Sequence, residues 1–212
     1  MLRRLLLLAI MVAAPGLVQA QDSDALIQRV DDHYNRLSSL KARYSEHYAG
    51  MGLDRTETGT LLLKKPGRMR WSYDQPEGKL FVLDGKFAWF YTPGDAQVQR
   101  IPAKQLDDLR SPLRFLLGRT QLKKELGNLT IVGDSHGIHI AGVPRGMEQR
   151  IRRLTLDVTQ AGAIQHMKLE EIDGAITEFT FTEVVENVPT READFVFTAP
   201  EGITVVDSLP PV

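Results

Sequence analysis

The chain of 212 residues contains no cysteine, which excludes a disulfide framework and a cysteine-based metal site. It has no internal repeat, no low-complexity segment and no phosphate-binding loop, so it offers no means of using ATP. The chain also has no large excess of either charge. It contains 26 basic and 27 acidic residues, which excludes the basic signature of nucleic-acid-binding proteins. After residue 20 no apolar run approaches the ~20 residues that span a bilayer.

The first twenty residues have the pattern of an export signal. Arg3 and Arg4 precede an apolar run over residues 5–14, and small residues lead up to Ala20. About ten apolar residues are too few for a membrane anchor, which needs ~20. Cleavage after Ala20 would leave Gln21 at the new N-terminus, and because Gln21 is not a cysteine we expect no lipid anchor there.

We therefore predict two segments, a cleavable signal peptide over residues 1–20 and a single domain over residues 21–212. An exported domain without disulfides depends on packing alone, which fits the bacterial periplasm better than eukaryotic secretion. Loss of Arg3 and Arg4 leaves 24 basic against 27 acidic residues, a net charge of −3. The domain then has no strong attraction to nucleic acid or to anionic lipid.

Hydrophobic periodicity predicts one helix followed by many strands. Apolar residues recur at helical spacing over residues 24–39, with charged residues on the other face, and this pattern indicates an amphipathic helix. The period then changes to two, with turn residues such as Asp84-Gly85 between the segments. The expected strands cover residues 41–48, 57–64, 68–73, 79–84, 87–92, 129–133, 137–141, 150–158, 164–172, 175–185 and 194–198.

Each expected strand has one apolar and one polar face. Met69 and Trp71 share one face of their strand, whereas Arg68 and Arg70 share the other. A single antiparallel sheet with so many strands has to curl or split, and these faces favour a sheet that encloses apolar space. We therefore predict a mainly β (α+β) fold, an antiparallel sheet curled towards a barrel.

A helical interruption is expected in the middle of the chain. Residues 104–109 form one or two turns, and Ser111-Pro112 opens a short helix over residues 113–117. This second helix is apolar nearly all round, with Arg114 as its one charge. It is either a plug on the core or a lid over the mouth of the curled sheet. A curled sheet, an amphipathic helix and an apolar lid would together form a container for a hydrophobic ligand.

The sequence contains two possible catalytic or metal-binding motifs, but neither has the predicted secondary structure that its chemistry requires. Residues 133–137 match the G-x-S-x-G pattern around Ser135, but a strand is expected after the serine where hydrolases have a helix, so a hairpin turn is favoured. His136 and His139 have a spacing that suits a helix, and no helix is predicted there. We therefore expect no catalytic residues, no metal and no cofactor, and a hydrolase using Ser135 stays a minor alternative.

Four segments, in order, resemble the family of the periplasmic outer-membrane lipoprotein carrier, LolA. They are GTLLLKKPGRMRW at residues 59–71, LDGK followed by WFYTP at residues 83–93, SPLRFLL at residues 111–117 and FVFTAPEGITV at residues 195–205. Each motif alone is weak, whereas four in order after a signal peptide are fairly specific. The resemblance covers essentially all of residues 22–207. It implies an incompletely closed antiparallel β-barrel with helices as a lid over a hydrophobic cavity.

The resemblance also implies a function and a set of partners. A carrier of this family is a soluble periplasmic shuttle, expected here as a monomer and not as an enzyme. It takes acylated lipoproteins from an inner-membrane ABC transporter and delivers them to an outer-membrane receptor lipoprotein. The alternative is a sensor on the same fold, or a carrier of another hydrophobic ligand, without a transfer role.

Site residues follow from the same resemblance. Lys65 takes the place of an arginine that latches the lid in the family, and lysine lacks the planar multi-donor fork of arginine. The residues expected to line the acyl-binding cavity are Leu26, Val30, Leu37, Met69, Trp71, Trp89, Leu113, Phe115, Leu116 and Leu117.

Overall fold

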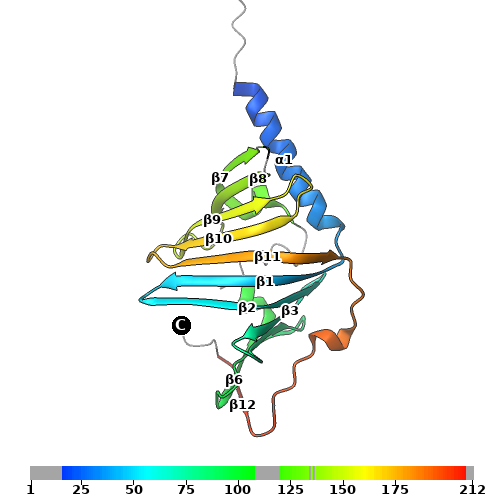
Figure 1. Ribbon diagram of the computed structural model, residues 1–212, viewed down its shortest axis with the longest axis vertical. Coiled ribbons are helices and arrows are strands. Elements are labelled where there is room, and N and C mark those ends of the chain that lie inside the picture. Colours follow the sequence, from blue (N-terminus) through cyan, green and yellow to red (C-terminus); the bar gives the residue numbers. More distant parts are fainter. Residues whose placement is uncertain (1–15, 108–119, 134, 136, 209–212) are drawn as a thin grey trace, which may run out of the picture.

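The computed structural model describes residues 16–107, 120–133, 135 and 137–208, and these are mostly β-strand. The strands are β1 (Ser39–Gly50), β2 (Leu53–Lys64), β3 (Arg68–Gln75), β4 (Leu80–Leu83), β5 (Phe87–Tyr91), β6 (Gln97–Pro102), β7 (Leu126–Gly133), β8 (Ile138–Pro144), β9 (Ile151–Val158), β10 (Ile164–Glu171), β11 (Ile176–Glu186) and β12 (Thr204–Val206). They form one sheet in the order β12-β6-β5-β4-β3-β2-β1-β11-β10-β9-β8-β7 (Figure 1). Because β12 and β7 are its two ends and do not pair, the sheet stays open, and the prediction of an incompletely closed curled sheet is confirmed.

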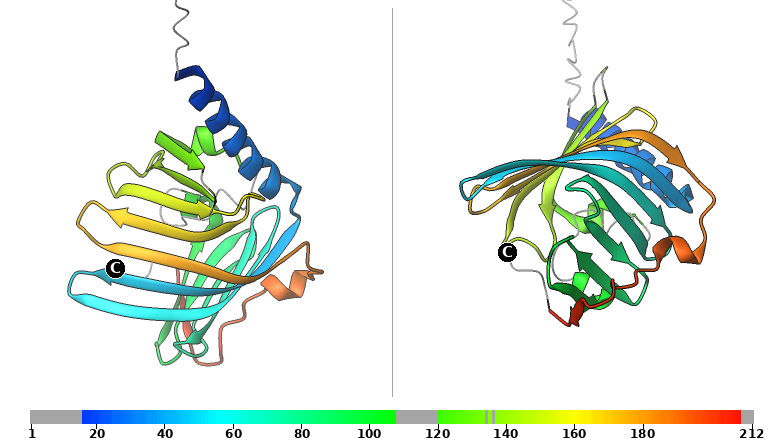
Figure 2. Two further views of the ribbon diagram at one scale, coloured as in Figure 1. Left: turned by 45° about the horizontal axis from the view of Figure 1, so that its top comes forward. Right: turned by 60° about the horizontal axis from the view of Figure 1, so that its bottom comes forward.

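Helices are few in the described residues. They are α1 (Gly16–Arg36), α2 (Ala103–Asp107), α3 (Leu122–Glu125) and the 3-10 helix η2 (Glu192–Phe195). Figure 2 shows a curved sheet, with α1 packed along one side of the half that contains β7 to β10. The Tyr34 hydroxyl of α1 accepts a hydrogen bond of 2.8 Å from the Ile164 amide of β10, which fixes the helix to that half.

The start and end of α1 differ from the prediction. The helix ends at Arg36, before the expected residue 39, because both the amide and the hydroxyl of Ser38 donate to the Asn187 side chain, at 2.9 and 3.1 Å. It begins at Gly16, earlier than the expected residue 24. The amphipathic helix between these points is confirmed.

The middle of the chain agrees with the prediction where it is described. α2 occupies most of the helical turn expected over residues 104–109. The prediction that strands flank the G-x-S-x-G segment is confirmed, since β7 ends at Gly133 and pairs antiparallel with β8, which begins at Ile138. The expected apolar helix over residues 113–117 lies outside the described residues.

The C-terminal segment corrects two predictions. Residues 194–198 are not a strand, because the Arg191 amide donates to the Asp194 carboxylate at 2.7 Å and closes the 3-10 turn of η2. The sheet is also not wholly antiparallel, since β12 pairs parallel with β6, with Thr204 opposite Gln97. Neither β6 nor β12 was expected. Their parallel pairing joins segments about one hundred residues apart, so the sequence near each strand does not indicate it.

Candidate ligand-binding interior

The inner face of the sheet is built by strict alternation on β1, β2 and β3. Residues directly opposite each other in an antiparallel pair share a face. Leu63 lies opposite Met69, and Leu61 opposite Trp71, so their side chains gather on one side. The Trp71 indole donates to the Met69 sulfur at 2.8 Å, which satisfies its one donor within the core. Further members of the buried cluster are Leu40, Ala42, Tyr44, Leu83, Leu154, Leu156, Met167 and Phe179.

α1 packs against part of this face and is held by specific bonds. Its apolar residues Ile27, Val30 and Tyr34 are buried in the same cluster. On its other side, the Asp31 carboxylate accepts the Leu122 amide at 3.0 Å. The Asn35 side chain pairs with the backbone of Thr120, donating to its carbonyl at 3.0 Å and accepting from its amide at 2.8 Å. Side-chain hydrogen bonds therefore attach the helix to the chain around residues 120–122.

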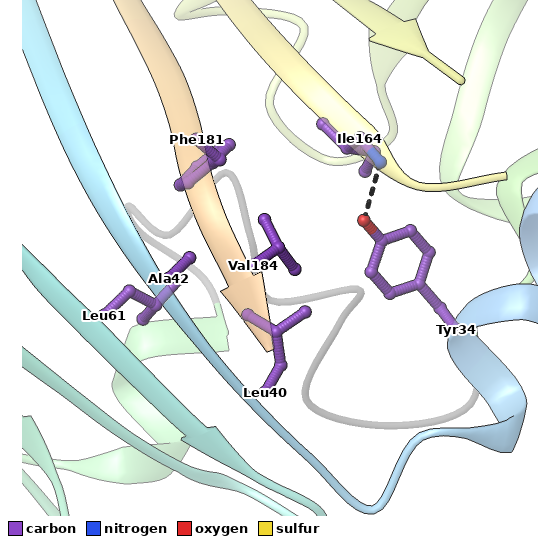
Figure 3. A pocket seen from close by; sticks show the side chains of 7 residues that line it. All are labelled: Tyr34, Leu40, Ala42, Leu61, Ile164, Phe181 and Val184. Atoms are coloured by element: carbon purple, nitrogen blue, oxygen red, sulfur yellow. Dashed lines mark hydrogen bonds between the residues drawn. The ribbon is translucent and has the colours of Figure 1, made fainter. Parts of the chain in front are cut away.

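A small apolar cavity lies between α1 and the sheet (Figure 3). Its lining residues are Tyr34, Leu40, Ala42, Leu61, Ile164, Phe181 and Val184. Its volume of about 20 Å³ is enough for a water molecule, whereas pockets for small-molecule ligands measure ~300–1,000 Å³. Val184 is 39% exposed, so the cavity reaches the surface at β11. An acyl chain would enter only if α1 and the sheet moved apart here.

The structure brings most of the described cavity candidates together. Val30, Leu37, Met69 and Trp71 are buried members of the cluster, and Leu26 packs against it. Leu113, Phe115, Leu116 and Leu117 lie outside the described residues.

Trp89 is the exception, because it lies on the opposite face of the sheet. Its neighbour Ala88 pairs with Leu83 on the inner face, so Trp89 points outwards. There the Trp89 indole donates to the Asp84 carboxylate at 2.8 Å, and its ring lies 5.5 Å from the ring of Phe197. Trp89 therefore fastens the C-terminal segment to the outer face and does not line the interior.

Lys65 contacts α1 directly. Its ammonium donates a hydrogen bond of 2.7 Å to the carbonyl of Tyr34, in the last turn of the helix. Its amide donates to the carbonyl of Ser38 at 2.8 Å. Burial lowers the pKa of Lys65, because the ammonium is partly withdrawn from water. A cation at a helix C-terminus is stabilised by the helix dipole, so Lys65 secures the end of α1 to the sheet.

The far end of the inner face is polar, and the sequence analysis missed it. Glu46 and Glu57 lie directly opposite each other on β1 and β2. Both Glu57 oxygens accept from the Lys79 ammonium, at 2.8 and 2.7 Å, and this ammonium also lies 4.4 Å from the centre of the Tyr73 ring. A signal was present in the sequence, because Glu57 continues the alternation of Leu61 and Leu63 and so had to point inwards.

Burial perturbs the carboxyl group of Glu46. Loss of contact with water, and then the negative charge of Glu57, raise the pKa of Glu46 to about 7. Burial also raises the pKa of the neighbouring Tyr44 and Tyr73 hydroxyls. The inner face therefore combines an apolar part under α1 with an end where charged groups are partly withdrawn from water.

The described residues show no other arrangement with obvious chemistry. Within them no group of three or more His, Asp or Glu side chains could hold a metal ion. Among their helices, none combines the length and the apolar composition that crossing a bilayer requires. Fold and interior together define a class of protein, a curled open sheet whose apolar inner face lies under a helix, which suits the binding of hydrophobic ligands.

Comparison with known proteins identifies the family within this class. The family model described as "Outer membrane lipoprotein carrier protein LolA" matches residues 36–198. This chain belongs to the LolA family, as the sequence motifs indicated.

Relatives and a solved structure agree with that membership. The outer-membrane lipoprotein carrier protein of Azotobacter vinelandii is 31% identical over 207 residues, which cover 96% of this chain and 97% of that protein. The protein of the same name from Nitrosomonas europaea is 26% identical, over 94% of this chain and 98% of that protein. An uncharacterized conserved protein from Thermus thermophilus has a TM-score of 0.57 at 14% identity, over 89% of this chain and 100% of that chain, which shows a shared fold.

Proposed function

We propose that this protein is a periplasmic carrier of acylated lipoproteins. In this role it takes cargo from an inner-membrane ABC transporter and delivers it to an outer-membrane receptor. The observation that carries the proposal is the apolar inner face of an open sheet, covered by a helix that side-chain hydrogen bonds attach. Membership of the LolA family and the names of its relatives support the same role.

The energetics of an acyl chain explain why such a carrier is needed and how it works. Exposing a chain of ~16 carbons to water costs on the order of 13 kcal/mol, at ~0.8 kcal/mol for each CH₂ group. The sequence has no nucleotide-binding loop, so the energy for extraction comes from the transporter. Delivery must then run downhill, which requires that the carrier hold its cargo only moderately. An interior that closes to about 20 Å³ limits the affinity, because opening it uses part of the binding energy.

A release assay tests the carrier role. Spheroplasts of the parent bacterium, making a labelled outer-membrane lipoprotein, are incubated with the protein purified from the periplasm. We expect the lipoprotein to appear in the soluble fraction in complex with the protein. If it stays on the membrane although the protein binds a fluorescent lipid, the carrier role is contradicted and a sensor or a carrier of another ligand replaces it.

The contact of Lys65 with α1 predicts a role in retaining the ligand. Lys65→Met removes the charged hydrogen bond to the Tyr34 carbonyl, which should lower the stability by about 1 kcal/mol and speed lipid release several-fold. Lys65→Arg should keep most of the contact. Release is measured as the loss of fluorescence of a bound lipid after dilution, and stability by urea unfolding.

Lys64→Met is the matched control for this experiment. Lys64 precedes Lys65 but pairs with Glu192 at 2.9 Å, away from α1, in a contact that is largely exposed on the acidic side. Removing such a surface pair should change stability by less than about 0.5 kcal/mol and leave release unchanged. Equal release rates for the Lys65→Met and Lys64→Met proteins would show that Lys65 does not retain the ligand.

A further inference from the structure

The polar end of the inner face contains a buried hydroxyl that no hydrogen bond of good geometry satisfies. Tyr44 is 3% exposed, and its hydroxyl forms no hydrogen bond of good geometry with any described residue, although the Tyr73 hydroxyl is near enough to influence its pKa. The ring crosses β2 at Gly59, where a β-carbon would lie 2.8 Å from the Tyr44 hydroxyl and 2.1 Å from the carbonyl oxygen of Ser72. A glycine at this point is what allows the hydroxyl to reach the interior. A buried hydroxyl without a partner is costly, and such exceptions call for an explanation.

A partly buried carboxylate lies beside Tyr44. Glu46 follows Tyr44 on the inner face of β1 and contributes to the raised pKa of its hydroxyl, so the two groups lie within electrostatic range. Glu57 has its charge balanced by Lys79, whereas Glu46 forms neither a hydrogen bond nor a close ion pair with any described residue. Lys79 and Arg55 act on Glu46 only through longer-range attraction. At one end of the apolar face, therefore, neither the Tyr44 hydroxyl nor the Glu46 carboxylate has a hydrogen bond of good geometry to a described residue.

The chemistry of these groups selects the ligand that would satisfy them. A carboxylate accepts hydrogen bonds, and a phenol hydroxyl both accepts and donates. A group with nitrogen-bound hydrogens can donate a hydrogen bond to each of these two acceptors. Its bond to the carboxylate would be charge-assisted. An anionic head, such as a fatty-acid carboxylate or a phosphate, would meet the like charge of Glu46, which no close ion pair balances.

We propose that this polar end receives a hydrogen-bond-donating nitrogen, an ammonium or an amide, at the head of an acyl chain that lies along the apolar part of the inner face. The proposal rests on the proposed function, because it assumes that the interior binds acyl chains. It adds an orientation, with the head at Glu46 and Tyr44 and the tail towards α1. It also adds selectivity, since acyl chains with anionic heads are disfavoured.

This proposal is tested with four probes that have the same chain length and different head groups. Dodecylamine, dodecanamide, dodecanol and dodecanoate compete with a fluorescent lipid for the purified protein at pH 8, where Glu46 is mainly ionised. We expect dodecylamine or dodecanamide to bind about tenfold more tightly than dodecanoate. A preference for the amine alone identifies a cationic head, and a preference for the amide alone identifies an amide head.

Two variants test whether Glu46 causes the preference for a nitrogen head over a carboxylate head. Glu46→Leu should reduce this preference to less than about threefold without changing the affinity for dodecanol, because the alcohol tests the apolar part alone. The control is Glu178→Leu, since Glu178 lies one strand away on the outer face, paired with Lys168 at 3.5 Å. This control should keep the full preference.

The outcomes separate this inference from the proposed function. If dodecanol binds but the wild-type protein shows no preference for nitrogen, or if Glu46→Leu retains the preference, the inference is wrong and the carrier function is unaffected. If none of the four probes displaces the lipid, the interior is not a site for acyl chains, and the proposed function fails together with the inference.

Discussion

Val184→Glu is expected to weaken lipid loading strongly, whereas Val185→Glu should leave it intact. The two valines are neighbours on β11 and point to opposite faces. Val184 lines the cavity under α1, while Val185 lies opposite Lys41 on the outer face. A carboxylate against an acyl chain loses its hydration without gaining a partner, so affinity should fall more than about tenfold. The measurement is binding of a fluorescent lipid, followed by the release assay with spheroplasts.

The exposure of both valines makes this comparison reliable. Val184 is 39% and Val185 53% exposed, so both variants should fold, which urea unfolding can verify. Met69 is unsuitable for the same test, because it is fully buried and a glutamate there would destabilise the protein itself. Normal lipid loading by the Val184→Glu protein would show that the cavity does not lead to the ligand site. Equal loss in both variants would point to a general effect of negative charge on β11.

Lys79→Met is expected to cause the largest loss of stability, about 3 kcal/mol near neutral pH. Glu57 is only 7% exposed, and Lys79 supplies both of its hydrogen bonds. Without the ammonium, a buried carboxylate next to Glu46 would stay uncompensated. The double variant Lys79→Met/Glu57→Gln removes the charge as well and should recover most of the loss. The free energy of unfolding from urea titrations measures each step.

A surface lysine provides the comparison for this prediction. Lys168 lies 3.5 Å from Glu178 and 3.8 Å from Glu170, and it is well exposed. Lys168→Met should therefore change stability by less than about 0.5 kcal/mol. If Lys79→Met costs no more than Lys168→Met, the ion pair between Glu57 and Lys79 does not stabilise the inner face. If the double variant is as unstable as Lys79→Met alone, the loss is due to packing of the lysine stem and not to charge.

Local alternation made much of the sheet predictable from the sequence. On β3, Met69 and Trp71 alternate with Arg68 and Arg70, so the inner face could be recognised before any strand pairing was known. On β5 the sequence Phe-Ala-Trp-Phe-Tyr has no charged residue, and the face of Trp89 could not be decided locally. The outer face is favoured because the ring of Trp89 packs there against Phe197, which belongs to a segment more than one hundred residues further along the chain.

Long-range pairing and charged residues at inward positions account for the other differences. β12 has three residues and pairs with a strand about one hundred positions earlier, so neither its length nor its neighbours could indicate it. Glu46 and Glu57 occupy inward positions, but charges near strand ends are usually solvated, and the pattern suggested nothing more. Their role became visible only when β1 and β2 were placed side by side and Lys79 was found paired with Glu57.

The position of α1 at the start of the chain determines the order in which the molecule can be assembled. Its hydroxyl contact with Ile164 joins residues 130 positions apart, and its contact with Thr120 joins residues 85 positions apart. Although α1 precedes the sheet in the sequence, it cannot complete its docking until β10 is in place, because Ile164 is part of the surface that receives it. Closing such distant contacts is slow compared with forming the neighbouring hairpins. While the sheet forms, its apolar inner face is therefore exposed for a time without α1, and chaperones that bind apolar surfaces can bind it in that interval.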